Sequence, residues 1–174
     1  WRRDLADTIL SPSLPVQVLL LLGSNIRPDH HMDAALGMLK AQMSMVAHSP
    51  IFQTPPIDAP GTPDYLNQAV IICSRIHSDE LRRQLREIEG SLGRIRTEVE
   101  NAPRTIDLDI LAAADREQRI MGDWPINPAL NSLHHAAVPA AMIASGWRFP
   151  ASKLTIGESV RLLGEVPDGF KQLS

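Results

Sequence analysis

Apolar residues along this chain recur with two spacings, one typical of strands and the other typical of helices. Short apolar runs that stop at turn-forming residues, such as 16–22 before Gly23, predict strands. Apolar residues three and four positions apart, as in 29–46, predict amphipathic helices with one buried face. The predicted strands are 16–22, 48–54, 65–76 and 105–112, and the predicted helices are 29–46 and 78–92.

The order of these elements, β-α-β-β-α-β, is that of the split βαβ or ferredoxin-like arrangement. It predicts an α+β fold with an antiparallel sheet, with both helices on one face and the other face left for function or further cover. Beyond Ala114 the pattern weakens, and short helices are predicted at 139–144 and 157–163 as C-terminal additions.

Length and composition indicate one domain with a full core. The chain has 174 residues, of which 44% are hydrophobic. Residues 1–15 are interrupted by prolines and are interpreted as a leader or linker, followed by a single domain at 16–174. The first residue is Trp1, which suggests a fragment, a processed chain or one segment of a larger polypeptide.

Charge and residue usage exclude several classes of function. A net charge of -3 and an aromatic content of 4% give no reason to expect a nucleic-acid surface. No apolar run approaches the ~20 residues that span a bilayer, so no membrane partner is expected. The single cysteine excludes a disulfide framework and indicates a reducing compartment, so we expect a cytoplasmic protein.

Two acidic residues, Asp107 and Asp109, alternate with apolar residues in the segment PRTIDLDIL (103–111). Side chains on a strand alternate between its faces, so both carboxylates point the same way, about 6–7 Å apart. That separation suits two oxygen ligands of a hard cation, and we expect Mg²⁺ held by carboxylates and completed by substrate phosphates. The alternative interpretation is a solvated acidic face on an edge strand.

Arginines accompany this acidic pair. Arg104 stands just before the strand, and Arg94 and Arg96 lie upstream of it. Their guanidinium groups suit phosphate oxygens. The stretch 94–103 therefore resembles a loop that closes on phosphates, although it also fits a charged, solvated connector.

A second group of residues suits a flat heterocycle. Tyr65 and Asn67 share a strand face, so that a ring can stack on the phenol while the carboxamide hydrogen-bonds its edge. Such a pair is also common on ordinary surfaces. Thr54 and the prolines Pro55 and Pro56 can present rigid backbone groups to the same ligand, although two prolines also simply end a strand.

Two further residues, Glu89 and His134, are candidates for the site. Glu89 borders the apolar stripe of the second helix and can reach the sheet, although a solvated helix flank is the commoner place for such a residue. His134 and His135 lack further histidines or cysteines at zinc-ligand spacing, so a zinc site is not favoured. His134 is interpreted instead as a hydrogen-bond donor to phosphate.

Taken together, five segments resemble the 6-hydroxymethyl-7,8-dihydropterin pyrophosphokinase family. They are LLGSN (21–25), SPIFQTPPI (49–57), PDYLNQAV (63–70), IEGSLGRIR (88–96) and PRTIDLDIL (103–111). The last of these with an upstream GRxR is a specific signature. The resemblance implies a ferredoxin-like fold with added elements. It also implies transfer of a pyrophosphoryl group from ATP to the hydroxymethyl group of the pterin, giving AMP and the pterin diphosphate in folate biosynthesis.

The resemblance implies a role for each matching residue on the phosphate side. Asp107 and Asp109 would hold two Mg²⁺ ions that bridge the ATP phosphates. Arg94 and Arg104 would contact the phosphates and stabilise developing charge, and Arg96 would belong to the closing loop. The catalytic set is Arg94, Arg104, Asp107 and Asp109, and the ATP-binding set is Glu89, Arg94, Arg96, Arg104, Ile110 and His134.

On the pterin side, the resemblance implies that Tyr65 stacks on the ring and that Asn67 hydrogen-bonds to it. Backbone groups of Ile110 would lie near the adenine. The pterin-binding set is Thr54, Pro55, Ile57, Tyr65 and Asn67. ATP and the pterin are the expected partners of a monomer, unless the chain is part of a larger folate-pathway polypeptide.

Two departures from the family pattern concern the edges of the site. Asn101 stands where the family often has a tryptophan of the closing loop. After His135 the chain is shorter than the family, and the arginine and the aromatic residue that complete the pterin site have no obvious counterpart. The alternative function is a catalytically weakened or repurposed domain that binds nucleotide or pterin within a multi-domain folate enzyme.

Overall fold

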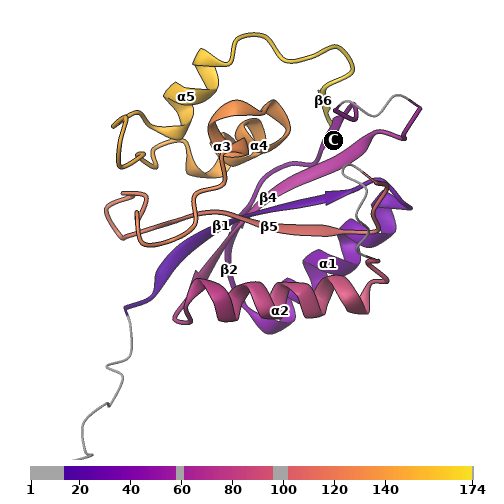
Figure 1. The fold of residues 1–174 in the computed structure, drawn as a ribbon, viewed down its shortest axis with the longest axis horizontal. Helices are drawn as coiled ribbons and strands as arrows, with labels where there is room; N and C mark the ends of the chain where they lie inside the picture. Colours follow the sequence, from indigo (N-terminus) through magenta and orange to yellow (C-terminus); the bar gives the residue numbers. More distant parts are fainter. Residues whose placement is uncertain (1–13, 58–60, 96–101, 174) are drawn as a thin grey trace, which may run out of the picture.

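An antiparallel sheet lies between two layers of helices in the computed structural model of the chain, which describes residues 14–57, 61–95 and 102–173 (Figure 1). The strands are β1 (Val16–Ser24), β2 (Ser44–His48), β3 (Phe52–Thr54), β4 (Tyr65–Ser74), β5 (Asp107–Ala114) and β6 (Lys171–Gln172). Helices α1 (Pro28–Gln42) and α2 (Ser78–Ser91) cover one face of the sheet. Helices α3 (Ala129–Ser132), α4 (His134–Ala144) and α5 (Ile156–Leu162) lie over the other.

The strand order confirms the predicted ferredoxin-like core. The strands follow one another as β5-β1-β4-β3-β6, and β2 pairs with β4 beside β3. All the strand pairs are antiparallel, so β4 and β5 run in the same direction on either side of β1. The helix α2 connects them as the crossover of a split βαβ unit.

The predicted strand 48–54 is wrong as a continuous element, because the chain forms two strands, β2 and β3, on the same edge of β4. Pro50 lies between them and has no amide to donate to the ladder. Ser49 satisfies the backbone groups of Ala69 on β4 between the two strands. Its amide donates to the Ala69 carbonyl at 2.9 Å, and its hydroxyl accepts from the Ala69 amide at 3.0 Å.

The predicted helix 29–46 is wrong at its C-terminal end. The helix ends at Gln42, Met43 is extended with φ -135° and ψ 153°, and β2 begins at Ser44. Met43 and Met45 still pack against the same core as α1. The helical spacing of apolar residues also runs on from Met43 to Val46, but pairing with β4 makes 44–48 a strand.

Three other predicted boundaries shift by a few residues. The fourth predicted strand, 105–112, is displaced to Asp107–Ala114, and the third ends at Ser74 instead of at residue 76. The short helix predicted at 139–144 begins earlier, at His134, where α4 starts. Shifts of one or two residues are ordinary at element ends, whereas α4 begins five residues earlier than predicted.

Both faces of the sheet are buried, which explains why β1 is apolar at nearly every position. Val18, Leu20 and Leu22 pack with α1 and α2, whereas Leu19 and Leu21 pack with the C-terminal helices. The face that the sequence left for function or further cover is thus largely covered by the C-terminal additions. None of the helices in the described part of the chain is long and apolar enough to cross a membrane.

Candidate active site

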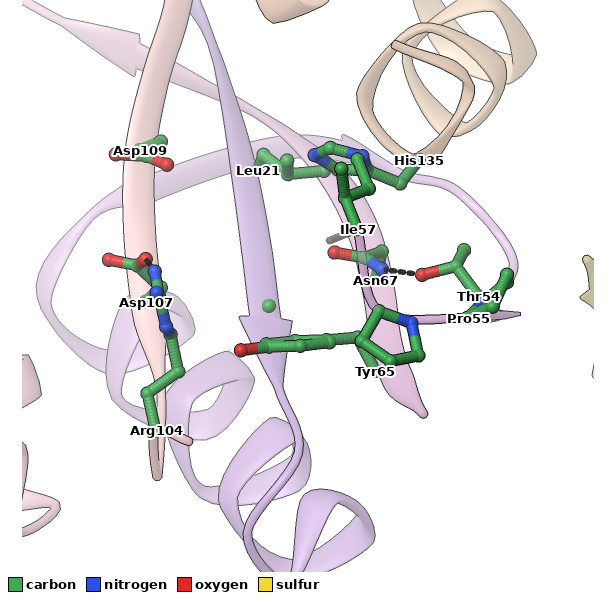
Figure 2. A pocket seen from close by; sticks show the side chains of 12 residues that line it. Leu21, Thr54, Pro55, Ile57, Tyr65, Asn67, Arg104, Asp107, Asp109 and His135 are labelled. Carbon is green, nitrogen blue, oxygen red and sulfur yellow. Dashed lines mark hydrogen bonds and ion pairs between the residues drawn. The ribbon is translucent and has the colours of Figure 1, made fainter. Parts of the chain in front are cut away.

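Strand register brings four of the predicted site residues to one end of the sheet. Asp107 on β5 pairs with Gly23 on β1, which pairs with Asn67 on β4, and Thr54 on β3 pairs with Tyr65. Paired residues on neighbouring strands share a face, so these side chains all point into one pocket beside α4 (Figure 2). The pocket is lined by Leu21, Gly23, Thr54, Pro55, Pro56, Ile57, Tyr65, Asn67, Arg104, Asp107, Asp109 and His135.

The acidic pair has the predicted orientation. Leu108 and Ile110 belong to the core under α1 and α2, so Asp107 and Asp109 point to the opposite face, into the pocket. Both side chains project from β5 in Figure 2, where Asp107 lies beside Arg104. The alternating pattern thus correctly predicted that the two carboxylates share a face.

Asp107 is held by two arginines that come from outside its strand. Arg104 donates from Nη1 to one carboxylate oxygen, and Arg94 Nη2 lies 3.6 Å from the other. Arg94 also donates to the Ile106 carbonyl at 3.3 Å, while its buried Nε has no hydrogen-bond partner among the described residues. These cations offset the charge of Asp107 and leave hydrogen-bond capacity for an anionic ligand.

Among the residues whose positions are described, Asp109 has no such partner, and its environment disfavours the ionised form. Its side chain reaches solvent but sits in a concave site, and loss of hydration there is the largest cause that raises its pKa, to about 6. The negative charges of Asp107 and Glu89 raise the pKa further, against the opposing effect of Arg104 and Arg94. A cation bound beside Asp109 would relieve this cost.

The donor set fits a magnesium ion that is shared with substrate. No group of three or more His, Cys, Asp or Glu side chains that could hold a metal occurs among the residues with described positions. Two carboxylates on one face supply hard oxygen ligands. Mg²⁺ is commonly bound by one or two carboxylates, with water and substrate phosphates completing its coordination.

The end of the pocket that suits a flat heterocycle is built around Asn67, a residue only 4% exposed. Its Nδ2 donates to the Thr54 hydroxyl at 2.8 Å, which fixes the orientation of the carboxamide. A Cβ atom at Gly23 would lie 3.1 Å from Asn67 Oδ1. Glycine at this position therefore leaves room for the Asn67 side chain.

Tyr65 forms one side of this end of the pocket. In Figure 2 the phenol ring lies below Asn67, while the ring of His135 lies above it. The Arg104 guanidinium carbon lies 5.9 Å from the centre of the Tyr65 ring. Tyr65 thus borders both the acidic pair and the carboxamide, so one ligand can contact all three.

The two adjacent histidines have different surroundings, and the sequence pointed to the other one of the pair. His135 lines the pocket, whereas Nε2 of His134 lies 3.4 Å from the Gly164 carbonyl and the side chain is not part of the lining. Burial lowers the pKa of His135, which favours a neutral imidazole. Adjacent residues on a helix face different directions, so only one of the two histidines on the first turn of α4 can face the pocket.

Glu89 is almost fully buried, at 2% exposure. Its Oε1 accepts from the Leu108 amide at 2.8 Å and thereby ties α2 to the start of β5. Glu89 is not among the lining residues of the pocket. Arg96 falls outside the described residues, so its predicted place in a closing loop stays a prediction.

A second cleft, which we call the α2–β5 cleft, adjoins the acidic pair on the outer side of β5. It contains Ile110, the residue predicted to lie near adenine. Its lining consists of Arg82, Arg86, Asp107, Leu108, Asp109, Ile110, Pro125, Ile126, Asn127 and Pro128. Because Asp107 and Asp109 line both spaces, the pocket and the cleft meet at the carboxylates.

The model of the 7,8-dihydro-6-hydroxymethylpterin-pyrophosphokinase (HPPK) family matches residues 19–145. The chain belongs to this family. An HPPK relative from Bacillus subtilis, named 2-amino-4-hydroxy-6-hydroxymethyldihydropteridine pyrophosphokinase, is 37% identical over 95 residues, which cover 53% of this chain and 56% of the relative. The relative of the same name from Synechocystis sp. is 36% identical over 97 residues, covering 56% of this chain and 49% of the relative.

Other relatives are much longer than this chain. A mitochondrial folate synthesis bifunctional protein from Arabidopsis thaliana is 33% identical over 125 residues, which cover 71% of this chain but only 22% of the relative. The match with a second Arabidopsis folate synthesis bifunctional protein covers 20% of that relative. The chain thus corresponds to about a fifth of these bifunctional proteins and about half of the shorter relatives.

Solved structures agree with the fold. A crystal structure of wild-type Plasmodium falciparum HPPK-DHPS aligns with a TM-score of 0.70, at 10% sequence identity, over 95% of this chain and 49% of that chain. A triple mutant of the same protein aligns with a TM-score of 0.69. At this identity, the likeness concerns the HPPK fold alone.

Proposed function

We propose that this HPPK-family chain transfers a pyrophosphoryl group from ATP to 6-hydroxymethyl-7,8-dihydropterin, giving AMP and the pterin diphosphate. One observation carries the proposal. A site for a flat polar ring, built on Tyr65 and Asn67, opens directly onto an acidic pair with two arginines. The names of the relatives supply the substrates, since both shorter ones are called hydroxymethyldihydropteridine pyrophosphokinases.

The pterin is proposed to lie over Asn67, between the rings of Tyr65 and His135. The Tyr65 phenol offers one stacking face, and His135 offers a second from α4. The Asn67 carboxamide retains hydrogen-bond capacity beyond its bond to Thr54 and can recognise the amide edge of a pterin. Pro55 and Ile57 border the same space, in agreement with their proposed pterin contacts.

The ATP phosphates are proposed to lie at the acidic pair, where Asp107 and Asp109 would hold two Mg²⁺ ions. When bound, the ions would neutralise the phosphate oxygens and make the β-phosphorus more open to attack. Arg94 and Arg104 already lie at Asp107 and would contribute positive charge to the developing transition state. The proposed role of Arg104 requires its guanidinium to turn from Asp107 toward phosphate.

The reaction needs no covalent intermediate with the protein. The oxygen of the pterin hydroxymethyl group forms a bond to the β-phosphorus, and the bond from the β-phosphorus to the oxygen that bridges it to the α-phosphate breaks. AMP leaves with that bridging oxygen, and the hydroxyl proton is released. The contribution of the protein is to align the two substrates and to offset charge, which is the general logic of phosphoryl transfer.

The other expected ATP-binding residues, Ile110, Glu89 and His134, differ in how near they lie to the pocket and the cleft. Ile110 borders the α2–β5 cleft, so its proposed contact with adenine agrees with its place in the fold. Glu89 would act through its bond to the Leu108 amide, by fixing the strand that carries the carboxylates. The proposed phosphate contact of His134 finds no support in its position, and we propose His135 as the histidine of the site.

The compartment and the assembly are proposals as well. The single cysteine suggests a cytoplasmic location. One Arabidopsis relative is named as mitochondrial, which suggests a mitochondrial location instead. The two bifunctional relatives agree with the expectation that this chain can be one segment of a larger folate-pathway polypeptide. As a separate protein it is expected to be monomeric.

The decisive experiment measures release of AMP from Mg-ATP, with and without the pterin. We expect AMP and pterin diphosphate in equal amounts only when both substrates are present. Calorimetry on the same protein then separates the possible failures. Binding of ATP without binding of pterin, together with no turnover, would contradict the proposal and favour a weakened nucleotide-binding domain.

A further inference from the structure

Residues 164–173, which we call the C-terminal strap, run from just after α5 to the outer edge of the sheet (Figure 1). All of its residues are exposed except Phe170 and Leu173, which are partly buried. The strap therefore adds little to the core, and its contacts with other elements decide what it does for the fold.

The far end of the strap is bound to β3, a strand of only three residues. Strand β6 pairs with Phe52 and Gln53 of β3. Just beyond β6, the Leu173 amide donates to the Ile51 carbonyl at 2.8 Å. The ring centres of Phe170 and Phe52 lie 5.6 Å apart, with the ring planes tilted by 41°. An aromatic pair at this distance stabilises beyond its buried area, so the strap holds β3 from its outer side.

Strand β3 leads directly into the end of the pocket around Asn67. Thr54 is the last residue of the strand, and its hydroxyl accepts the hydrogen bond that orients the Asn67 carboxamide. Pro55 and Ile57 follow and line the same end of the pocket. A displacement of β3 relative to β4 would therefore move several lining residues together.

The near end of the strap lies at the start of α4. Nε2 of His134 lies 3.4 Å from the Gly164 carbonyl and can donate to it when this nitrogen carries the proton. The chain turns at Gly164 with φ 79°, a conformation that favours glycine. The residue after His134 on α4 is His135, which lines the pocket. The strap thus connects α4 and β3, and each of these elements carries pocket-lining side chains.

We propose that the C-terminal strap positions the pterin end of the pocket, with Phe170 and His134 as its positioning residues. This inference rests on the proposed function, because it assigns the strap to the pterin half of that site. By holding both α4 and β3, the strap sets the spacing between His135 and Thr54. Small displacements of substrate-positioning groups are costly even when their cause lies far from the chemistry. No residue of the strap lines the pocket or the α2–β5 cleft, so ATP binding should not depend on it.

The test measures the KM values for pterin and ATP, and the affinities for pterin and for a non-hydrolysable ATP analogue by calorimetry. The variants are Phe170→Ala, Phe170→Leu, His134→Ala and His134→Gln. Val166→Ala is the matched control, because it removes apolar atoms from a residue of the same strap that is 46% exposed. An aromatic pair is worth about 2- to 12-fold in an equilibrium constant, which sets the upper limit for Phe170→Ala.

We expect Phe170→Ala to raise the KM and Kd for pterin by about 2- to 12-fold and His134→Ala to raise them by about 2-fold, with ATP values unchanged. Phe170→Leu and His134→Gln should recover part of the loss, because they keep an apolar side chain and a donor amide. Val166→Ala should behave like the parent chain.

Three results would overturn the inference. The first is unchanged pterin affinity in both alanine variants, and the second is an equal effect of Val166→Ala. The third is a loss of affinity for the ATP analogue as large as that for pterin, which would assign His134 to the phosphates or Phe170 to the stability of the whole fold. If Phe170→Ala loses its fold by circular dichroism, His134→Ala and His134→Gln decide the question. Failure of the parent chain to release AMP with pterin present would instead refute the proposed function.

Discussion

Replacement of Asp109 by asparagine should stabilise the protein at neutral pH while removing its activity. Asp109 sits beside Asp107 and Glu89 in a site where hydration is reduced, and its pKa is raised from 3.8 to about 6. An acid with a raised pKa in the folded state opposes folding when it is ionised. Asparagine keeps the shape of the side chain and removes the charge.

The pH window follows from the direction of the shift. Below about pH 4 the carboxyl is protonated in both the folded and unfolded states and does not affect stability. The cost of ionising it in the fold grows between about pH 4 and pH 6 and is complete above that range. The full shift corresponds to about 3 kcal/mol, but Asp109 reaches solvent, and screening reduces the expected effect to about 1 kcal/mol.

Urea unfolding without magnesium or nucleotide measures this effect. At about pH 7.5 the Asp109→Asn variant should be more stable than the parent chain by about 1 kcal/mol, and the difference should nearly vanish at about pH 4. The variant Asp33→Asn, at an exposed position of α1, is the control and should show no such pH-dependent gain. A variant that is less stable than the parent chain at pH 7.5, or that differs equally at both pH values, would refute the reasoning.

Three further predictions address other parts of the fold. Gly23→Ala places a Cβ 3.1 Å from Asn67 Oδ1 and should displace the Asn67 carboxamide. The loss of about one hydrogen bond from Asn67 to the pterin, roughly 1 kcal/mol, should raise the KM for pterin about 5-fold while the KM for ATP is unchanged. Asp107→Asn should lower turnover by more than about 100-fold with little change in the circular dichroism spectrum, because metal charge stabilisation is worth several kcal/mol; turnover near the parent value would remove the metal assignment. Thr155→Ala removes the capping box that Thr155 and Glu158 form at the start of α5, and should lower stability by about 1 kcal/mol in urea unfolding with kcat unchanged.

Much of the fold could be predicted because its elements have strong local patterns. The apolar stripe of α2 and the continuous apolar run of β1 identify a helix and a buried strand from neighbouring residues alone. The prediction failed where local pattern and long-range pairing disagree. The helical apolar spacing of α1 continues through Met43 to Val46, yet pairing with β4 makes 44–48 a strand.

The candidate site shows the same division. The sequence singled out Asp107, Asp109, Tyr65 and Asn67 as candidates, from charge or hydrogen-bonding capacity within a strand pattern, and the fold brings all four to one pocket. The sequence proposed His134 for the site, whereas in the fold His135 lines the pocket. Which of the two histidines faces the pocket depends on the position of α4 against the sheet, which the local sequence pattern does not reveal.

By itself, the sequence determined which side chains share a face, because alternation along a strand is a property of the extended backbone and needs no knowledge of neighbours. It therefore placed Asp107 with Asp109, and Tyr65 with Asn67, on common faces. Only the tertiary structure decided that these two pairs meet across Gly23, because strand register is set by hydrogen bonds and packing between residues far apart in the chain. The same long-range packing placed His135 over the pocket.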